Sequence, residues 1–450
     1  MPSPTPLNLT VTDPTERLLV EQALAFAREL RRTASASPDG RVPRNAESFC
    51  VVQGREFLRT ASATVLQAEA DAVEKKGVPA RRCPCGTRRD NKGRHNRQVL
   101  TGVGWIDLSR LHLVCISPAC RDSVQPLDDR LGLTDGLTEA ARRLLSSAGG
   151  SWSFDSASHH LKTFCGLDAS DEFIRRVAEA AGKKLAVWMD EAPEATEAFE
   201  NAPGDAEFET DGTAVNTTEG RKEAKIGIFA KRERGESVET ERWADRKLPT
   251  PAARFAFARI AESVDFAPQW GSTATRLGLD PRAGTIAVLA DGAAWIWARA
   301  DEQFPGSPQV LDIFHALKYV GDGAKWLFGD GTPEAKTHAD RGRALLLADG
   351  YVGIETWVGE MLAAGPKGDG ASLGGVSNDL KDHDGRLNYA LRLKRGQSIG
   401  TGMVEGAAKN LIGKRLKANN ARWCVGNVGK MAGLCSALSS DCWDNFWNAA

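Results

Sequence analysis

The 450-residue sequence lacks an apolar run long enough to cross a membrane, which takes about 18 residues. The best candidate, Thr285–Trp297, is interrupted by Asp291, so no transmembrane helix is expected. The opening residues, Met1-Pro2-Ser3-Pro4, contain neither a basic segment nor an apolar segment, so a secretory signal is not expected either. These absences predict a cytoplasmic protein without a membrane partner.

An excess of one charge is also missing, since 58 basic and 59 acidic side chains give a formal net charge of −1. This balance excludes a uniformly basic nucleic-acid-binding protein. Hydrophobic residues make up 42% of the chain and charged residues 26%, which excludes wholesale disorder and fibrous repeats. A chain of this length and composition predicts two or three domains with hydrophobic cores.

The charges are nevertheless unevenly distributed. Basic residues predominate in Arg81–Arg110 and again in Lys394–Lys430, whereas Leu185–Glu209 holds eight acidic residues and no basic one. A single charged run is often only a solvated surface. Two basic runs that flank an acidic one, in a nearly neutral chain, fit local contact with DNA better.

Residues 1–80 predict a helical N-terminal region. Asp13 is a helix N-cap, Pro14 suits the first helical position, and Glu16 completes the start signal. A second helical pattern runs from about 46 to 75. Packing or dimerisation is the expected role of this region, because it carries no pattern typical of a catalytic site.

Residues 81–130 predict a basic, zinc-ribbon-like module. Two short β-like runs, Gln98–Leu100 and Trp105–Val114, have a cysteine pair at each end. The pairs are Cys83 with Cys85, and Cys115 with Cys120. Four thiolates suit a closed tetrahedral site for structural Zn²⁺, the alternative being four ordinary thiols. Nine cysteines in a chain without an export signal favour metal ligands or reduced thiols over disulfides.

Residues 137–184 predict a helix-turn-helix module. Short helices are expected at 139–147, 154–164 and 171–181, the last of them ending at Gly182. A glycine-containing turn, Gly166-Leu167-Asp168, leads to Ser170 as the N-cap of the third helix. This is the outline of a DNA-binding helix-turn-helix, the alternative being a plain helical hairpin.

Two arginines of the third helix, Arg175 and Arg176, are expected to reach DNA phosphates or base edges. The acidic segment 185–205 then predicts a linker into the next domain.

Residues 206–450 predict an α/β domain. Strands are expected at 207–210, 224–230, 241–248, 285–290 and 309–312, and helices at 251–264 and from about 314. This alternation favours an RNase H-like sheet. The expected fold class is therefore multidomain α/β: a helical N-terminus, a zinc ribbon, a helix-turn-helix and an RNase H-like catalytic domain.

Two of the expected strands end in an aspartate that is followed by glycine, at Asp211-Gly212 and Asp291-Gly292. Such a pair alone is usually an ordinary turn. Carboxylates at the ends of adjacent strands, however, are well placed to share the two metal ions of a phosphoryl-transfer site, with a third carboxylate completing the charge. Glu405 is the best third candidate, because it is the only acid in the second basic run. Mg²⁺ prefers such oxygen ligands.

Four motifs carry a resemblance to a known family. They are Asp211-Gly212-Thr213, Asp291-Gly292-Ala293 with Trp295-Ile296-Trp297, Asp312-Ile313-Phe314-His315, and Gly400-Thr401-Gly402-Met403-Val404-Glu405-Gly406. Together they resemble bacterial insertion-sequence transposases of the DDE class, in particular the Kra-type group. That group has a DGT-like turn, a DGA-like turn before a Trp-rich strand, an Asp-x-x-His motif and a GSGxVEG-like helix start. The resemblance spans about residues 81–447, with Thr401 at a position where serine is common and Cys-x-Cys in place of Cys-x-x-Cys.

The resemblance implies that Asp211, Asp291 and Glu405 hold two Mg²⁺ ions, or Mn²⁺ in their place. With these ions the protein would nick the DNA at the element's ends and join the freed 3′-hydroxyl to target DNA. Asp312 and His315 would lie at the catalytic site, and residues 315–398 would form a mostly helical insertion. Phosphate contacts would come from Lys409, Lys414, Arg415, Lys417 and Arg422.

The partners implied are the terminal inverted repeats of the element, the target DNA and a second copy of the chain, in a homodimer or higher oligomer at the bacterial nucleoid. Two other functions stay open: an RNase H-like nuclease that cuts without joining, and a catalytically inactive, transposase-derived DNA-binding regulator. Two DNA-binding modules before the catalytic domain favour the transposase over the nuclease. The intact carboxylate set favours catalysis over binding alone.

Overall fold

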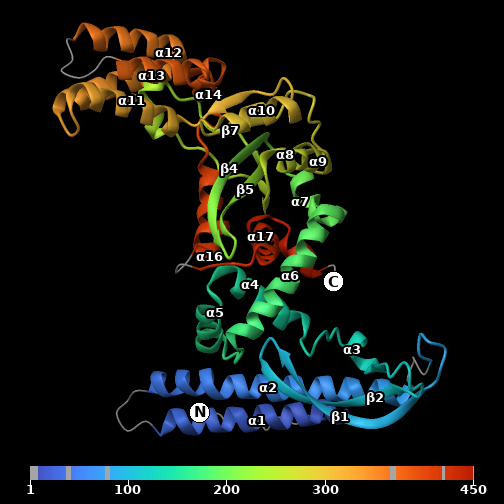
Figure 1. Ribbon diagram of the computed structural model, residues 1–450. Helices are drawn as coiled ribbons and strands as arrows, with labels where there is room; N and C mark the ends of the chain where they lie inside the picture. Colours follow the sequence, from blue (N-terminus) through green and yellow to red (C-terminus); the bar gives the residue numbers. More distant parts are fainter. Residues whose placement is uncertain (1–8, 37–41, 77–81, 365–370, 418–420, 449–450) are drawn as a thin grey trace. The chain divides into compact units, whose positions relative to one another are not determined.

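The computed structural model describes residues 9–36, 42–76, 82–364, 371–417 and 421–448. The fold is mixed α/β, with two separate β-sheets (Figure 1). The described residues form two compact units: one comprises those up to 149 together with 154–177, and the other 150–153 together with those from 178 onward. No helix in the described part of the chain is long and apolar enough to span a membrane.

The first unit begins with two helices, α1 (Pro14–Ser35) and α2 (Val42–Lys76), which lie side by side (Figure 1). Asp13 caps α1 by accepting two backbone N–H groups, as its sequence signal predicts. Phe26 of α1 packs against two phenylalanines of α2. The described residues of α1 include none that is buried, so this helix contributes little to a core.

The expected hairpin is present and longer than its apolar pattern indicates. Strands β1 (Arg89–Thr101), β2 (Gly104–Cys115) and β3 (Ser123–Val124) form an antiparallel sheet in that order, followed by α3 (Pro126–Arg130). The first half of β1 is exposed and polar, so it lacks the alternation of apolar and polar residues that indicates a strand. The apolar half of the hairpin packs against the C-terminal part of α2, around Ala70.

Three further helices follow, α4 (Glu139–Ser151), α5 (Phe154–His160) and α6 (Asp171–Glu191). A π-helical turn extends α5 to Cys165, and Gly166 then takes the left-handed conformation, with φ of 69°. The hydroxyl of Ser170 accepts the backbone N–H of Phe173 at 3.2 Å, as an N-cap does. The short glycine turn between two helices is thus where the sequence predicts it.

Helix α6 does not end at Gly182, contrary to the prediction. Gly182 lies inside the helix at a close crossing with α17 (Val425–Ser439), where an added Cβ would lie 2.0 Å from the carbonyl oxygen of Lys430. The glycine is therefore explained by helix packing rather than by a helix end.

The segment 185–205 is not a linker. The end of α6, a 3₁₀ turn and α7 (Glu197–Glu200) occupy most of it. Leu185, Met189 and Phe199 are buried, while the acidic residues between them mostly face solvent. The charge of this segment belongs to the outer face of packed helices, which a count of acidic residues cannot distinguish from a linker.

The second unit contains a five-stranded sheet. Its strands are β4 (Asp205–Thr217), β5 (Gly220–Arg232), β6 (Ala253–Ile260), β7 (Ala287–Ala290) and β8 (Gln309–Leu311). Their order across the sheet is β6-β5-β4-β7-β8. The pairs β4–β5 and β5–β6 are antiparallel, whereas β4–β7 and β7–β8 are parallel.

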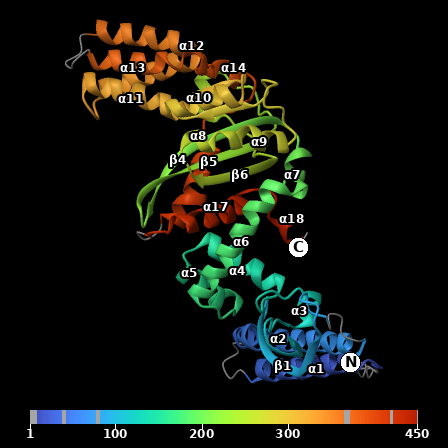
Figure 2. The same ribbon diagram turned by 45° about the vertical axis from the view of Figure 1, so that its right-hand side comes forward.

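Helices cover both faces of this sheet (Figure 2). On one face α8 (Ser263–Phe266), α9 (Pro268–Arg276) and α10 (Ala294–Gln303) enclose an aromatic core with Phe208 at its centre. On the other face lie α15 (Gly402–Ala407) and α17.

Three expectations about local structure are wrong. The expected helix at 251–264 is strand β6 over most of its length, and the expected strand at 241–248 is a 3₁₀ helix at Thr240–Asp245. The sequence of β6 is rich in alanine and arginine, which favour helix, but pairing with β5 overrides that preference. Trp295 and Trp297 lie in α10 rather than in a strand.

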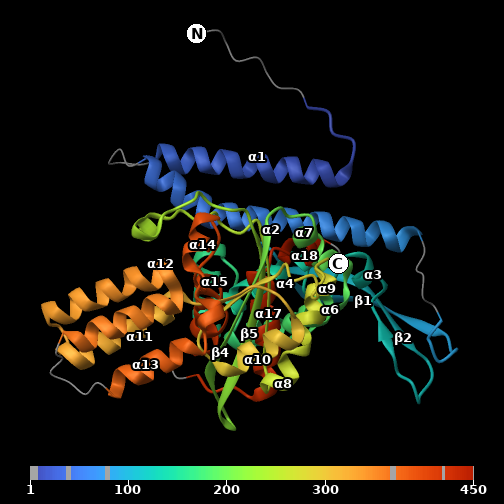
Figure 3. The same ribbon diagram turned by 90° about the horizontal axis from the view of Figure 1, so that it is seen from above.

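The segment after β8 is mostly helical, as expected for 315–398. Helices α11 (Ile313–Phe328), α12 (Pro333–Ala363) and α13 (Ala371–Lys381) lie side by side (Figure 3), and α14 (Tyr389–Lys394) follows. Helix α15 continues through a π-helical stretch into α16 (Lys414–Leu416). After α17, the described chain closes with α18 (Trp443–Asn448).

Candidate functional site

The expected aspartates lie in one row across the five-stranded sheet, but β4 does not end at Asp211 as predicted; it continues to Thr217. The register of β4 with β7, continued by two residues, sets Asp211 beside Asp291. The register of β7 with β8, continued by one residue, sets Asp291 beside Asp312. Three aspartates of neighbouring parallel strands therefore stand in one row.

The electrostatics of this row suit a cation. Burial raises the pKa of Asp211 above its ordinary value, and the nearby Asp291 carboxylate raises it further. A hydrogen bond from the backbone N–H of Gly212, at 2.6 Å, and the charge of Lys417 act in the opposite direction. A divalent cation beside Asp211 would stabilise the ionised form that burial and the neighbouring carboxylate disfavour.

Glu405 lies on α15, which packs against β4 and β5. Its carboxylate is exposed and pairs with Lys409 at 2.8 Å. Among the described residues, only the four cysteines discussed below have their ligand atoms within 4.8 Å of one another. The carboxylate oxygens of Asp211, Asp291 and Glu405 are therefore further apart than that. The helix nevertheless brings Glu405 to the strand that carries Asp211.

A column of acids on β4 explains how α15 is held there. Alternate residues of a strand share a face, so Asp205, Glu207 and Glu209 lie on the same face of β4 as Asp211. Each of the three binds the segment that leads to Glu405. Asp205 accepts from Gln397 at 3.1 Å, Glu207 from the hydroxyl of Ser398, and Glu209 from the backbone N–H of Val404 at 2.7 Å. We call Asp205, Glu207 and Glu209 the β4 acid column.

Glu209 is the most buried member of the β4 acid column, with 1% of its surface exposed. Burial raises its pKa to about 8, against the opposing effect of the Val404 N–H. The hydrogen bond joins residues 195 positions apart and holds the first turn of α15. The sequence prediction missed Glu207 and Glu209, although acids at every second position of an apolar strand were a visible signal.

Asp312 caps α11 and also holds the residue before α15. One carboxylate oxygen accepts from the backbone N–H of Phe314 at 2.6 Å and of His315 at 3.1 Å. The other accepts from the backbone N–H of Thr401 at 2.8 Å and from its hydroxyl. Both oxygens are thus engaged by protein donors, which assigns Asp312 a positioning role rather than that of a metal ligand.

His315 lies beside the turn that follows Asp291. A Cβ added to Gly292 would lie 2.8 Å from His315 Nε2, so the glycine allows this close approach. The imidazole stands edge to face with Tyr319, with ring centroids 5.2 Å apart. The structure therefore brings His315 to the aspartate row, as the sequence predicts.

The basic residues after Glu405 fall into two groups. Lys409, Lys414, Lys417 and Arg422 are exposed, and the Lys417 ammonium donates to the Thr213 hydroxyl near Asp211. Arg415 is different, because it is 3% exposed and its guanidinium lies 4.9 Å from the ring centroid of Trp423. Burial lowers its pKa to about 10. The expected phosphate contact therefore needs correction at Arg415, whose side chain packs in the core.

The two arginines predicted to contact DNA lie on α6. Arg176 is exposed, with its guanidinium 5.6 Å from the ring centroid of Phe173. Arg175 is half-buried and hydrogen-bonds to Glu172 at 2.6 and 2.8 Å. The turn before them is fixed by Trp105 of the hairpin, whose indole N–H donates to the carbonyl of Asp168 at 2.7 Å.

The four expected cysteine ligands meet at the end of the β1–β2 hairpin. The sulfurs of Cys83, Cys85, Cys115 and Cys120 all lie within 4.8 Å of one another. Cys83 is 3.6 Å from Cys120, and Cys85 is 3.6 Å from Cys115. Tetrahedral coordination with metal–sulfur bonds of about 2.3 Å separates the sulfurs by about 3.8 Å. The cluster could therefore hold a metal ion such as zinc.

Two further residues, which the sequence prediction missed, support this cluster. Arg89 is buried and donates to Asp122 at 2.5 Å, and Asp122 lies 3.6 Å from the sulfur of Cys83. The guanidinium places a positive charge near thiols that a metal would bind as thiolates. Hydrogen bonds from Thr87 lower the pKa of Cys85 to about 6, which favours the thiolate that a metal binds, whereas the pKa of Cys83 is raised to about 12 by burial and by its neighbouring thiols.

Comparisons with known proteins add no name to this geometry. Neither a scan against protein-family models nor a search of the curated proteins finds a match to the chain. The functional argument therefore depends on the residues and contacts described above.

Proposed function

We propose that this protein is a DNA transposase of the DDE class with an RNase H-like catalytic core. The observation that carries the proposal is the row of Asp211 and Asp291 on the central parallel strands of a sheet ordered β6-β5-β4-β7-β8, against which the helix that carries Glu405, α15, packs. Carboxylates on neighbouring strands suit metal-dependent phosphoryl transfer.

The residues divide into ligands and supports. Asp211, Asp291 and Glu405 would hold two Mg²⁺ ions, which when bound supply charge neutralisation and activate the attacking oxygen. Glu209 and Asp312 hold the start of α15 through Val404 and Thr401. They thereby fix the direction from which Glu405 approaches the aspartates. The donor set fits the ion, because all its ligands are carboxylate oxygens.

DNA contact is the second part of the proposal. The exposed lysines after Glu405, among them Lys417, whose charge acts on Asp211, would bind the phosphates that flank the cut. The cysteine hairpin, read as a zinc ribbon, and the α5–α6 helix-turn-helix would bind the ends of the element. Such binding by phosphate contacts weakens steeply as salt rises. A homodimer or higher oligomer would bring two ends together.

Substitution of Asp291 by asparagine tests the proposal. The purified full chain is incubated with Mg²⁺ and DNA that carries its native flanking sequences, and nicked and joined products are measured. Asp291→Asn removes one charged ligand, so we expect product formation to fall by at least about 10²–10³-fold. Asp265→Asn, an exposed aspartate of α8, is the matched control and should keep the activity.

Four outcomes are informative. Nicked and joined products with the wild type and the control alone support the transposase. Nicked products without joining favour an RNase H-like nuclease, and sequence-specific binding without nicking favours a DNA-binding regulator. Undiminished cleavage by Asp291→Asn would contradict the proposed metal site.

A further inference from the structure

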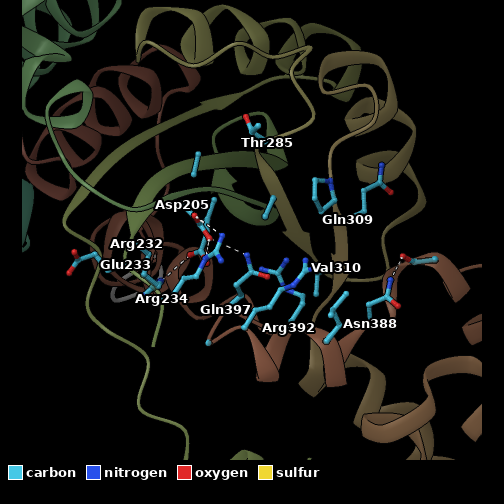
Figure 4. Close-up of a pocket in the computed structure, with 18 residues that line it drawn as sticks. Asp205, Arg232, Glu233, Arg234, Thr285, Gln309, Val310, Asn388, Arg392 and Gln397 are labelled. Atoms are coloured by element: carbon cyan, nitrogen blue, oxygen red, sulfur yellow. Dashed lines mark hydrogen bonds and ion pairs between the residues drawn. The ribbon is translucent and has the colours of Figure 1, made fainter. Parts of the chain in front are cut away.

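A cavity of about 370 Å³ opens where β4 and β8 begin (Figure 4). The aspartate row crosses the middle of β4 and the end of β7, so it lies further along these strands than the cavity. The end of β5, helix α14 and residues 395–397 complete its wall. Its size is that of a small-molecule site.

The acids on β4 that line this cavity are already engaged. Asp205 accepts from Arg234 at 2.8 Å and from Gln397 at 3.1 Å. Glu207 accepts from Arg232 at 3.0 Å and from the hydroxyl of Ser398. Figure 4 shows Asp205, Arg234 and Gln397 together at one side of the cavity. The negative charges of Asp205 and Glu207 are therefore compensated by neighbours, whereas Glu233, which also lines the cavity, is exposed.

Two arginines in the wall of the cavity have guanidinium N–H donors that a ligand could use. Arg392 of α14 is buried, and the bond that its guanidinium makes is from Nε to the carbonyl of Ser398 at 2.5 Å, which uses one of five N–H donors. Arg395, three residues on, is exposed, and no ion pair of its guanidinium is found among the described residues. Burial lowers the pKa of Arg392; the charges of Glu207 and Asp205 oppose this shift, and the charge of Arg395 adds to it. Two guanidinium groups on one wall are the arrangement that an oxyanion stabilises.

The rest of the cavity is less polar. Pro308 and Val310 of the β8 segment and Leu391 of α14 supply apolar surface, and Asn388 supplies an amide at the rim. A ligand that matches both parts has an oxyanion at one end and a flat, largely apolar group at the other. A nucleotide has this combination, and its size suits the cavity.

We propose that this cavity binds a nucleotide through its phosphate group, with Arg392 and Arg395 on the phosphate and the base against Pro308 and Leu391. The phosphate can belong to a free nucleotide or to the 5′ end of a DNA strand. The proposal does not depend on the proposed transposase activity, because the site lies away from the aspartate row and has its own residues.

The experiment measures binding to the purified full chain by calorimetry, with AMP, adenosine and short oligonucleotides with and without a 5′-phosphate. We expect AMP to bind at least about tenfold more tightly than adenosine, since charge-assisted bonds to the phosphate are lost without it. Arg395→Gln should weaken AMP binding by about tenfold. Lys394→Gln is the matched control, because Lys394 is the exposed neighbour and does not line the cavity.

The oligonucleotide arms identify the source of the phosphate. Tighter binding of the 5′-phosphorylated strand than of AMP, lost in Arg395→Gln, assigns the cavity to a strand end; preference for AMP assigns it to a free nucleotide. Equal affinities for AMP and adenosine, equal effects of Arg395→Gln and Lys394→Gln, or no binding of any probe would overturn the proposal. None of these readouts requires DNA cleavage, so failure here is distinct from failure of the proposed function.

Discussion

The cysteine cluster and the aspartate row are both candidate metal sites, yet they are built in different ways. The four thiol sulfurs already lie within 4.8 Å of one another, whereas the carboxylates of Asp211, Asp291 and Glu405 are less closely gathered. Thiols are neutral when protonated and can approach closely, while ionised carboxylates repel. A closed site can therefore be shaped by the chain alone, but a carboxylate site reaches its final geometry with its cations.

The two sites also differ in the length of chain that each must bring together. Cys83 and Cys120 are 37 positions apart, at the ends of one hairpin. Glu209 and Val404 are 195 positions apart, and their hydrogen bond is part of what places Glu405. The cysteine site thus depends on local structure, and the carboxylate site depends on supports from distant parts of the second unit.

The largest effect is expected at the cysteine cluster. Cys115→Ser removes one thiolate, so we expect bound zinc to fall from about one ion per chain to well below that. Metal binding is linked to folding, so the unfolding midpoint of the hairpin unit should fall as well. Metal analysis and thermal unfolding followed by proteolysis measure both. Cys165→Ser, an exposed cysteine of the same unit, is the control. Unchanged zinc content in Cys115→Ser would show that the four sulfurs do not form the site.

A smaller effect is expected at the β4 acid column. Glu209→Ala leaves the buried N–H of Val404 without an acceptor, which costs about 1–3 kcal/mol of unfolding free energy. Displacement of α15 should raise the Mg²⁺ concentration needed for DNA cleavage and lower the rate by about tenfold. Glu209→Gln keeps an acceptor oxygen, so the Mg²⁺ concentration that it needs for DNA cleavage should be close to that of the wild type. Equal Mg²⁺ requirements in Glu209→Ala and the wild type would contradict a positioning role.

A third difference between the two units is expected in the pH dependence of their stability. The pKa of Glu209 is raised to about 8, so the folded chain keeps a proton that the unfolded chain loses above about pH 4.5. The contribution of Glu209 to stability is therefore full below pH 4.5 and is lost as the pH rises towards 8, by up to ~1.4 kcal/mol per pH unit. Asp211 has a raised pKa and acts in the same direction.

The first unit should contain the opposite trend. Arg89 lowers the pKa of Asp122, and this contribution is lost as the pH falls through that lowered value. Urea unfolding between about pH 3 and 8.5, without Mg²⁺, measures the dependence for each unit. In Glu209→Gln the second unit should lose most of its pH dependence. The same dependence in Glu209→Gln and in the wild type would show that another group is responsible.

Short-range chemistry made much of this structure predictable from the sequence. The cap at Asp13 and the glycine turn at Gly166 each depend on residues a few positions apart, and both are where the sequence predicts them. The four cysteines could be predicted to meet, because a hairpin joins its own ends. Asp211 and Asp291 are neighbours as predicted, although the reason is the register of β4 with β7, since β4 continues past Asp211 to Thr217.

The structural features that the sequence did not indicate depend on contacts with residues far along the chain. Strand β6 has a composition that favours helix, and only its pairing with β5 makes it a strand. Gly182 looks like a helix end until the backbone of α17 is seen against it. From the sequence Glu209 is expected at the surface, but it is buried and accepts from the backbone N–H of Val404. Arg415 is expected to bind phosphate, but its guanidinium stacks on Trp423.

The β4 acid column has a consequence for the order of events during synthesis. Strand β4 leaves the ribosome long before Val404, at a translation rate of about 5–20 residues per second. During that interval Glu207 and Glu209 have no partners from the 398–404 segment, and their charges disfavour burial of this face. The face can close only when the last part of the chain has been made. An incomplete chain therefore lacks Glu405 and also the packed strand to which Glu405 belongs.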